Sequence, residues 1–503
     1  MSESSFKQNF LSFQGKSRIL HSTWLAFFIT FLVWFSHAPL MSTIKASMGL
    51  TDIEAKILLI LNVALTIPAR IVTGMLVDKY GPRNSYTAML VATAVLCFFF
   101  ASAQTFETLA LAKFLMGFVG AGFVIGIRMI SEWYPANQLG LAEGIYKGMG
   151  NVGSAVGAGT LVYIASLFGG EDGWRYAIAS TGVIALIYSA FYYYAVTDTP
   201  IGSTYFKPKK SGGLELTSKG DFIFCLLFNI PMVAALAILT WRVTDAGVVA
   251  GTGSDIIVGA GLISDFASYI IYGVLLALIA YQSWKLFEVN KEMLQSPPMD
   301  EILQYKFKQV AILSIGYAVT FGAELSVISM LAQYFESKFL VAAAAAGVFG
   351  ACFAAVDVIS CPSGGMISDK LGRKVPLIIL LSGASIGFFV MSMITPEWPL
   401  AAVVATMMIC SFFLGSAAGC VFAVVPLVKR KLTGQIAGTV GAYGNVGAVV
   451  FLLVFSFVSP SAFFATIAAG VAFAVLCSLF LDEPKDKMAE VMPDGTVQMI
   501  DVH

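Results

Sequence analysis

The residues of this chain that could do chemistry are a few charged and amide side chains inside long apolar stretches. Arg70 stands in the apolar segment 65–72, eight residues before Asp78. At about 1.5 Å of rise per helical residue, Arg70 would lie about 12 Å inside a membrane, where an arginine costs roughly 2.5–3.5 kcal/mol. We therefore expect it to face a cavity and meet an anion, with a structural ion pair as the alternative. Its planar fork suits a trigonal or carboxylate-like oxyanion.

Two glycine-rich stretches, 148–159 and 438–447, each carry an asparagine within the tetrapeptide Gly-Asn-Val-Gly. These are Asn151 and Asn445. Glycine lets helices approach closely, so packing alone would explain either stretch. An amide donor at matching positions of both stretches also favours a role in holding a bound oxyanion.

Other charged residues inside apolar stretches leave alternatives open. Arg128 is either a further anion ligand or the partner of Glu132 one turn on or of Glu324. Glu324 is the best candidate for a proton-coupling acid, because burial favours the neutral form of a carboxyl group; permanent pairing with Arg128 is the alternative. Glu143 and Lys147, four residues apart, are expected to pair within one helix.

The composition requires a membrane around the chain. Of 503 residues, 58% are hydrophobic and 12% are charged, and the mean hydropathy is +0.83; soluble domains carry about 25% charged residues. With about twenty apolar residues per span, the sequence predicts an all-α polytopic membrane protein of about fourteen spans, grouped six, two and six. We expect these spans at 22–45, 56–78, 85–104, 108–131, 142–168, 174–196, 221–242, 262–287, 308–335, 340–367, 374–394, 399–426, 436–458 and 460–482.

The composition also argues against several function classes. Lysine plus arginine and aspartate plus glutamate both number 30, so the basic surface of a nucleic-acid binder is not expected. The seven cysteines form no C-x-x-C pair, and neither a metal-ligand spacing nor a catalytic nucleophile arrangement is recognisable. We predict no enzymatic activity, no metal and no cofactor.

The distribution of positive charge predicts the orientation. Basic residues precede the first span and follow the second and sixth, whereas the opposite loops are mainly acidic. Because cytoplasmic loops are enriched in Lys and Arg, we expect both termini in the cytoplasm and a multi-pass protein of the cytoplasmic (inner) membrane. A monomer is expected.

The two groups of six spans are related by an internal repeat. The segment from Gly74 to Arg83 returns from Gly365 onwards, with Asp369 placed 291 positions after Asp78. The Gly-Asn-Val-Gly tetrapeptides are 294 positions apart. We predict a six-helix half at 1–200, a linker with two extra transmembrane helices at 201–305, a second half at 306–485 and a cytoplasmic tail at 486–503.

The repeated loop resembles the loop between spans two and three of the major facilitator superfamily. Its residues are Gly74, Asp78 and Arg83 in the first copy and Gly365, Asp369 and Arg373 in the second. Each aspartate can accept hydrogen bonds from a helix N-terminus, which would form a conformational latch. The resemblance implies two halves that rock around a midplane site.

Together, the span-two arginine and the paired asparagines within this frame resemble the nitrate/nitrite porter family. That resemblance implies an anion bound by Arg70, Asn151 and Asn445, flanked by Tyr317 and Phe321, which share one helix face at i and i+4. The partners expected are nitrate or nitrite, protons and the lipid bilayer. The expected function is nitrate or nitrite transport by alternating access, as proton symport or nitrate/nitrite exchange; another small anion such as a short carboxylate is the alternative.

One position departs from that family. The position 291 after Arg70, where the resemblance implies a second arginine, is Cys361. A cysteine provides no fixed positive charge, which leaves both the anion and the coupling mode open.

Overall fold

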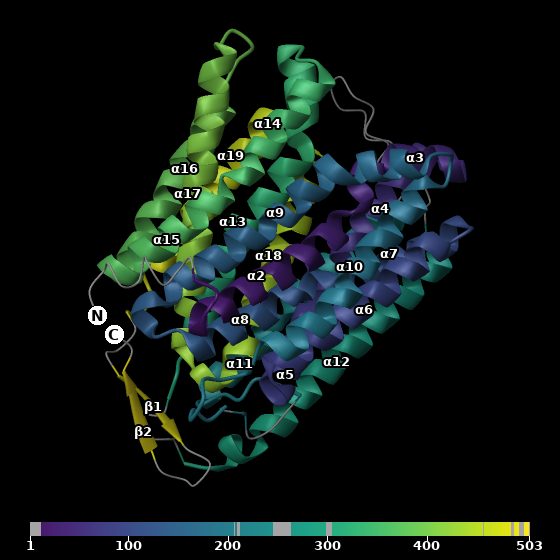
Figure 1. Cartoon of the computed structure of the whole chain (residues 1–503). Coiled ribbons are helices and arrows are strands. Elements are labelled where there is room, and N and C mark those ends of the chain that lie inside the picture. The colour runs from purple at the N-terminus through teal and green to yellow at the C-terminus, as the bar shows by residue number, and fades with distance from the viewer. Residues whose placement is uncertain are drawn as a thin grey trace.

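The structure, a computed structural model, describes residues 12–205, 207–208, 212–244, 263–297, 304–455, 457–483, 487–491 and 497–501. Within these residues, fourteen helical segments are long and apolar enough to cross a membrane. This confirms the predicted all-α fold of about fourteen spans. One feature not predicted is an antiparallel hairpin of β1 (Lys487–Val491) and β2 (Val497–Asp501), which projects from one end of the helices (Figure 1).

The first six spans form one half of the bundle, and several of them are broken into two helices. The elements are α2 (Gly15–Phe35), α3 (His37–Met48), α4 (Asp52–Ala64), α5 (Thr66–Tyr80), α6 (Pro82–Ser102), α7 (Phe106–Met116), η1 (Gly117–Ala121), α8 (Gly122–Trp133), α9 (Ala136–Phe168) and α10 (Gly173–Ala195).

Proline accounts for the break between α2 and α3. Pro39 has no amide hydrogen to donate to the carbonyl of Phe35, and its ring crowds that carbonyl, so a continuous helix is interrupted just before it. Beside the break, the side chains of Asn62 and Lys113 donate to the carbonyl of Trp34, each over 3.1 Å. Polar side chains therefore satisfy irregular backbone inside the protein, as a membrane requires.

The remaining spans comprise the inserted pair and the second half. The elements are α11 (Lys219–Thr244), α12 (Asp265–Gln295), α13 (Phe307–Phe339), α14 (Ala343–Ala355), α15 (Asp357–Leu371), α16 (Lys374–Ser392), α17 (Leu400–Val428), η2 (Arg430–Leu432), α18 (Thr433–Phe455) and α19 (Pro460–Ser478).

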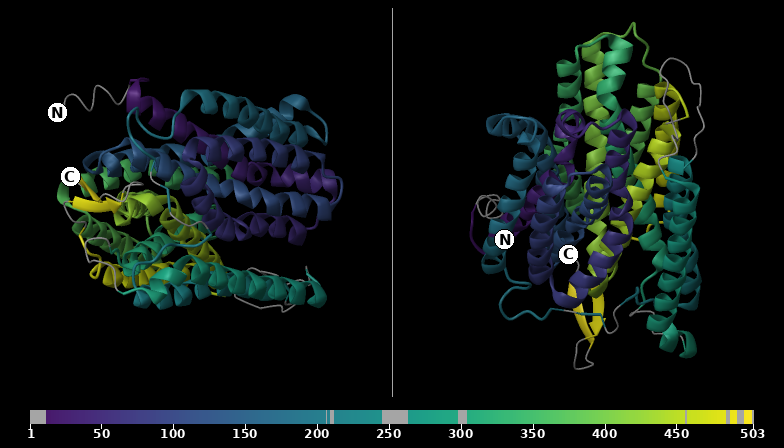
Figure 2. Two further views of the ribbon diagram at one scale, coloured as in Figure 1. Left: turned by 90° about the horizontal axis from the view of Figure 1, so that it is seen from below. Right: turned by 90° about the vertical axis from the view of Figure 1, so that its right-hand side faces the viewer.

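The inserted helices α11 and α12 stand side by side at one edge of the bundle, in teal in the right-hand view of Figure 2. α11 packs against α18 and α13, and α12 packs against α11. Phe228 of α11 stacks on Tyr443 of α18 with 4.4 Å between ring centroids. Large apolar side chains of α12, including Phe266, Tyr269 and Trp284, are exposed, as expected for a surface in contact with lipid.

The two halves meet along two crossing pairs of helices, α5 with α18 and α9 with α15. Glycines line both crossings. A Cβ added to Gly74 would collide with the backbone of Gly434, and one added to Gly365 would collide with the backbone of Gly140. Small residues at these points let the helices touch through their backbones, and the charged residues described next lie along the same two crossings.

Candidate functional site

One end of the bundle is closed by a symmetric pair of contacts, and we call it the latch end. Asp78 of α5 accepts hydrogen bonds from the amides of Gly434 and Gln435 at the start of α18, both over 2.9 Å. Asp369 of α15 accepts from the amides of Gly140 and Leu141 of α9, over 2.9 and 2.8 Å. Each aspartate therefore binds backbone amides of the opposite half near a helix N-terminus, where a negative charge is favoured.

The two arginines predicted for the latch make different contacts. Arg373 forms an ion pair with Asp369 over 2.6 Å and donates to the carbonyl of Ala136 in the opposite half. Arg83 instead donates to the carbonyl of Tyr193 within its own half, over 2.7 Å. This contact of the Arg83 side chain therefore lies within the first half and not across the interface.

Arg128 lies at the latch end, paired with two carboxylates. Its Nε lies 3.3 Å from Asp78 and its terminal nitrogen 2.9 Å from Glu132. Its Nε also donates to the Tyr205 hydroxyl over 3.2 Å. With both carboxylates and the guanidinium fully buried, the structure favours the ion-pair alternative for Arg128 over the anion-ligand role.

Arg70 lies between the halves, buried in protein and directed away from lipid. Its Nε donates to the carbonyl of Gly120 over 3.3 Å and its terminal nitrogen to that of Gly441 over 2.6 Å. The guanidinium carbon is 5.6 Å from the Phe123 ring and 5.0 Å from the Phe321 ring. Among the described residues, no acidic side chain forms an ion pair with Arg70. Arg70 is therefore a buried cation whose contacts are carbonyl groups and aromatic rings.

Two more predicted ligands lie close to Arg70. Tyr317 stacks on Phe321 with ring centroids 5.1 Å apart and lies within electrostatic reach of the guanidinium. Asn445 is fully buried, and its amide donates over a long 3.4 Å to the carbonyl of Gly441, which also accepts from Arg70. We call Arg70, Tyr317, Phe321, Asn445 and Phe123 the arginine site.

The glycines of α18 are what allow the arginine site to form. A Cβ at Gly441 would lie 3.1 Å from Cδ of Arg70, and one at Gly438 would lie 2.5 Å from its carbonyl oxygen. A Cβ at Gly444 would lie 2.6 Å from the Tyr317 ring. The sequence offered helix packing and anion binding as interpretations of this glycine-rich stretch. The two are compatible, because close packing at these glycines brings the residues of the arginine site together.

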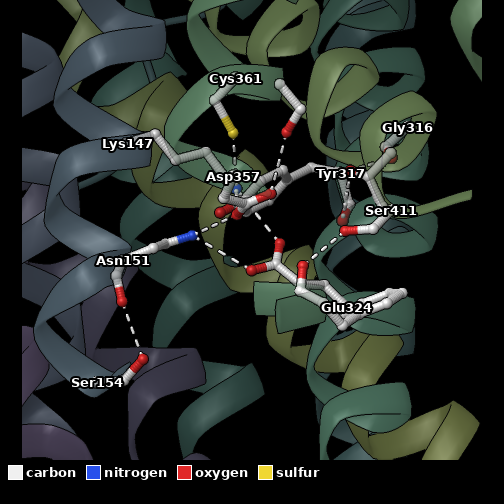
Figure 3. A network of polar contacts seen from close by, with 12 residues as sticks. Lys147, Asn151, Ser154, Gly316, Tyr317, Glu324, Asp357, Cys361 and Ser411 are labelled. Atoms are coloured by element: carbon white, nitrogen blue, oxygen red, sulfur yellow. Dashed lines mark hydrogen bonds and ion pairs between the residues drawn. The ribbon is translucent and has the colours of Figure 1, made fainter. Parts of the chain in front are cut away.

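A second charged group lies at the crossing of α9 with α15 (Figure 3), where Tyr317 of the arginine site is also drawn. Lys147 Nζ is 3.0 Å from Asp357, 3.3 Å from Glu324 and 3.4 Å from Cys361 Sγ. The amide of Asn151 donates to Asp357 over 2.7 Å and to Glu324 over 3.2 Å. Lys147 and Asn151 come from the first half and the other three from the second. We call these five residues the lysine cluster.

The lysine cluster corrects three predictions. Lys147 does not pair with Glu143 but with two carboxylates of the opposite half. Glu324 is paired with Lys147 and not with Arg128. Asn151 lies in the lysine cluster, while Asn445 lies beside Arg70. For Lys147, contacts across the interface outweigh the spacing along one helix.

Asp357 was not predicted as a site residue. It stands one turn before Cys361 inside the apolar run 340–367, and its depth in that run is the signal that could have identified it. Its carboxylate accepts from both Lys147 and Asn151.

The two charged groups occupy matching positions in the internal repeat. Cys361 follows Arg70 by 291 positions, and Gly441 follows Lys147 by 294, the offset that also relates Asn151 to Asn445. In one crossing an arginine of α5 therefore faces a glycine of α18. In the other a lysine of α9 faces a cysteine of α15. The positive charge is present at both places, but it is attached to opposite members of the crossing pair.

Two six-helix halves, paired aspartate latches and buried charges at the interface define a membrane transporter of the alternating-access class. Residues 23–452 match the Major Facilitator Superfamily. The xylose symporter XylE, solved with 6-bromo-6-deoxy-D-glucose, shares this fold with a TM-score of 0.58 at 15% identity, over 93% of this chain and 97% of that chain.

Closer relatives identify the branch of the superfamily. The nitrate/nitrite transporter NrtP of Picosynechococcus sp. is 42% identical over 97% of both chains. The protein of the same name from Nostoc punctiforme is 41% identical over 95% of both chains. The chain belongs to the major facilitator superfamily and, within it, to the nitrate/nitrite transporter family.

Proposed function

We propose that this protein carries nitrate and nitrite across the cytoplasmic membrane by alternating access, with the anion bound at the arginine site. The observation that carries the proposal is Arg70, a buried guanidinium with no acidic ion-pair partner among the described residues. Burying an unpaired charge is costly, so an anionic guest is the natural complement. The names of the two cyanobacterial relatives agree with this assignment.

The shape of the arginine site favours a small planar oxyanion. A guanidinium presents parallel N–H donors that fit two oxygens of one trigonal group. The rings of Tyr317 and Phe321 are stacked within 11° of parallel, and the ring of Phe123 lies within 6° of Tyr317. Nearly parallel rings favour a flat guest, and the buried amide of Asn445 can donate to a third oxygen.

The latch contacts support a conformation that is closed towards the cytoplasm. We place the latch end in the cytoplasm, because the basic loop residues after α5 and α15 lie there and positive charge marks the cytoplasmic side. In the present conformation both aspartate contacts are formed, so the pathway is closed to the cytoplasm. Release of the anion requires both contacts to break. Both charged groups are completed within one chain, so a monomer is the functional unit.

The charge count between the halves supports coupling to protons. Arg70 and Lys147 provide two positive charges, and Glu324 and Asp357 provide two negative charges when ionised. A bound nitrate would leave this buried region with one excess negative charge. One proton on the Glu324–Asp357 pair restores neutrality, so the site favours entry of one anion with one proton.

Uptake into proteoliposomes tests these proposals together. Labelled nitrate is offered to vesicles with an imposed pH gradient, with internal nitrite, or with neither. We expect the pH gradient to raise the initial rate at least tenfold. Stimulation by internal nitrite alone would replace symport with exchange. Stronger competition by formate or acetate than by unlabelled nitrite would change the substrate class to a short carboxylate.

A further inference from the structure

We propose that Glu143 is a second proton-binding site, through which the transported proton reaches the cytoplasm. The inference rests on the proposed proton coupling and adds a residue to it. Glu143 lies in α9, and its side chain is fully buried. Among the acidic side chains that the structure describes, only Glu143 has both carboxyl oxygens buried without a hydrogen-bond partner. A buried carboxylate in that situation would be strongly disfavoured, so Glu143 is held as the neutral acid.

Among the described residues, no cationic side chain forms an ion pair with Glu143. The helices that pack against α9 carry ionisable side chains that have other partners. Lys16 of α2 donates to the side chain of Gln138. On α15, Asp357 and Cys361 contact Lys147, and Asp369 binds Arg373 and backbone amides. Arg128 of α8 pairs with Asp78 and Glu132. Cys420 of α17 donates to the carbonyl of Gly364, and the hydroxyl of Tyr192 in α10 lies beside that of Thr23. On α9 itself, the Tyr146 hydroxyl donates to the carbonyl of Phe123.

The position of Glu143 along α9 indicates what it does. Gly140 and Leu141, three and two residues before it, donate hydrogen bonds to the latch residue Asp369. Lys147, one turn after it, is held by the lysine cluster. At about 1.5 Å per residue, Glu143 lies along α9 between the latch and the residues that contact the Glu324–Asp357 pair, and nearer to the latch. When the latch opens, Glu143 is the first acid of α9 behind it to meet cytoplasmic water.

The proton balance of the step is simple. The neutral Glu143 gives its proton to cytoplasmic water after the latch opens and becomes a carboxylate. It then takes up the proton carried by the Glu324–Asp357 pair and returns to the neutral acid. The net result is one proton moved from the pair to the cytoplasm.

The test uses full-length protein in proteoliposomes and compares Glu143→Gln with wild type. Glutamine keeps the size of the side chain but cannot release a proton. We expect nitrate uptake driven by a pH gradient, and the accompanying lumenal pH change, to fall at least tenfold. Exchange of labelled for unlabelled nitrate without a gradient should stay within about threefold. Glu336→Gln, a change at an exposed acid of α13, is the matched control and should alter neither.

Three results would overturn the inference. One is gradient-driven uptake by Glu143→Gln at the wild-type rate. Another is loss of uptake and exchange together in a variant that is as stable and monodisperse as wild type, since that would place Glu143 in anion binding. The third is failure of Glu143→Asp, which keeps a titratable group, to restore part of the coupled uptake.

A spectroscopic readout keeps the inference separate from the proposed function. The infrared carbonyl band of a protonated carboxyl group should be present in wild type and reduced in Glu143→Gln, whether or not the protein moves nitrate. Absence of that difference contradicts the neutral acid directly. If wild type carries no nitrate at all, the proposed function fails, and the infrared band still decides the state of Glu143.

Discussion

The arginine site and the lysine cluster are the same structural position in two related halves, filled in opposite ways. In the first, Arg70 of α5 reaches the carbonyl of Gly441 in α18. In the second, Lys147 of α9 reaches Cys361 of α15. Repeat symmetry alone would place an arginine at position 361; the chain instead carries the second positive charge on the facing helix. The comparison shows that the repeat preserves where charge is needed more strictly than which helix supplies it.

The two positions also differ in how their charge is balanced. Arg70 is surrounded by aromatic rings and backbone carbonyls, so its charge remains available to a ligand. Lys147 is held between Glu324 and Asp357, so its charge is neutralised by groups that can take up a proton. This asymmetry is the reason for the proposal that the anion binds at one position and the proton at the other.

The largest effect is expected from breaking the lysine cluster. Lys147→Met leaves two buried carboxylates without a cation, a change that costs roughly 3–5 kcal/mol. We expect at least a hundredfold loss of nitrate uptake and a lower thermal unfolding temperature in detergent. The double variant Lys147→Gly with Cys361→Arg recreates the Arg70–Gly441 arrangement in the second half, so it should recover stability and part of the uptake. A double variant no better than Lys147→Met would refute the equivalence of the two positions.

Replacing an acid of the lysine cluster by a side chain that cannot exchange a proton should uncouple transport. Glu324→Gln has the charge of the protonated acid at every pH, because an amide does not ionise. Uptake driven by a pH gradient should fall more than tenfold, whereas nitrate–nitrite exchange should continue and lose its dependence on pH. Both rates are measured in proteoliposomes between pH 6 and pH 8 on the same preparation. Retained gradient-driven uptake would exclude Glu324 from coupling.

The two latches should differ in strength. Asp78 is fully buried and also pairs with Arg128, whereas Asp369 pairs with Arg373 and is slightly exposed. Hydrogen bonds to charged groups contribute about 1.5–3 kcal/mol each, and solvent weakens the second set. Asp78→Asn should therefore shift the protein towards the open state more than Asp369→Asn. Cysteine-labelling rates at a residue introduced behind each latch measure the shift, and equal rates for both variants would contradict the ranking.

The smallest effect is expected from crowding Arg70. In Gly441→Ala, the added methyl group would lie 3.1 Å from Cδ of Arg70, tight enough to displace the guanidinium slightly. We expect KM for nitrate to rise about threefold to tenfold, corresponding to roughly 0.7–1.4 kcal/mol, with little change in kcat. Gly347→Ala, where nothing lies within 4 Å of an added Cβ, is the matched control. Identical kinetics for both variants would mean that Gly441 does not shape the site.

Much of the fold could be predicted from the sequence, because apolar span length and the repeated loop are local signals. The latch residues Asp78 and Asp369 also followed from that repeat. The predicted pairing of Lys147 was wrong, because its nearest charged neighbour in sequence, Glu143, is not its partner. Its partners Glu324 and Asp357 lie more than 170 positions away. Spacing along a helix does not reveal such contacts, which depend on how the two halves meet.

The same limit applies to Arg128 and Arg70, which look alike as arginines inside apolar stretches. Only the structure separates them, because Arg128 meets Asp78 and Glu132 while Arg70 meets carbonyls and rings. A single sequence reports that a charge is buried. It does not report what compensates that charge, and compensation distinguishes a structural ion pair from a ligand site.

Equilibrium binding of nitrate to purified Arg70→Lys tests whether Arg70 holds the anion. Lysine keeps the positive charge but loses the planar fork, so we expect at least a tenfold rise in Kd by calorimetry. Arg175→Lys, at an arginine of α10 paired with Asp172, should bind as wild type does. A Kd for Arg70→Lys within twofold of wild type would contradict the assignment of the anion to Arg70.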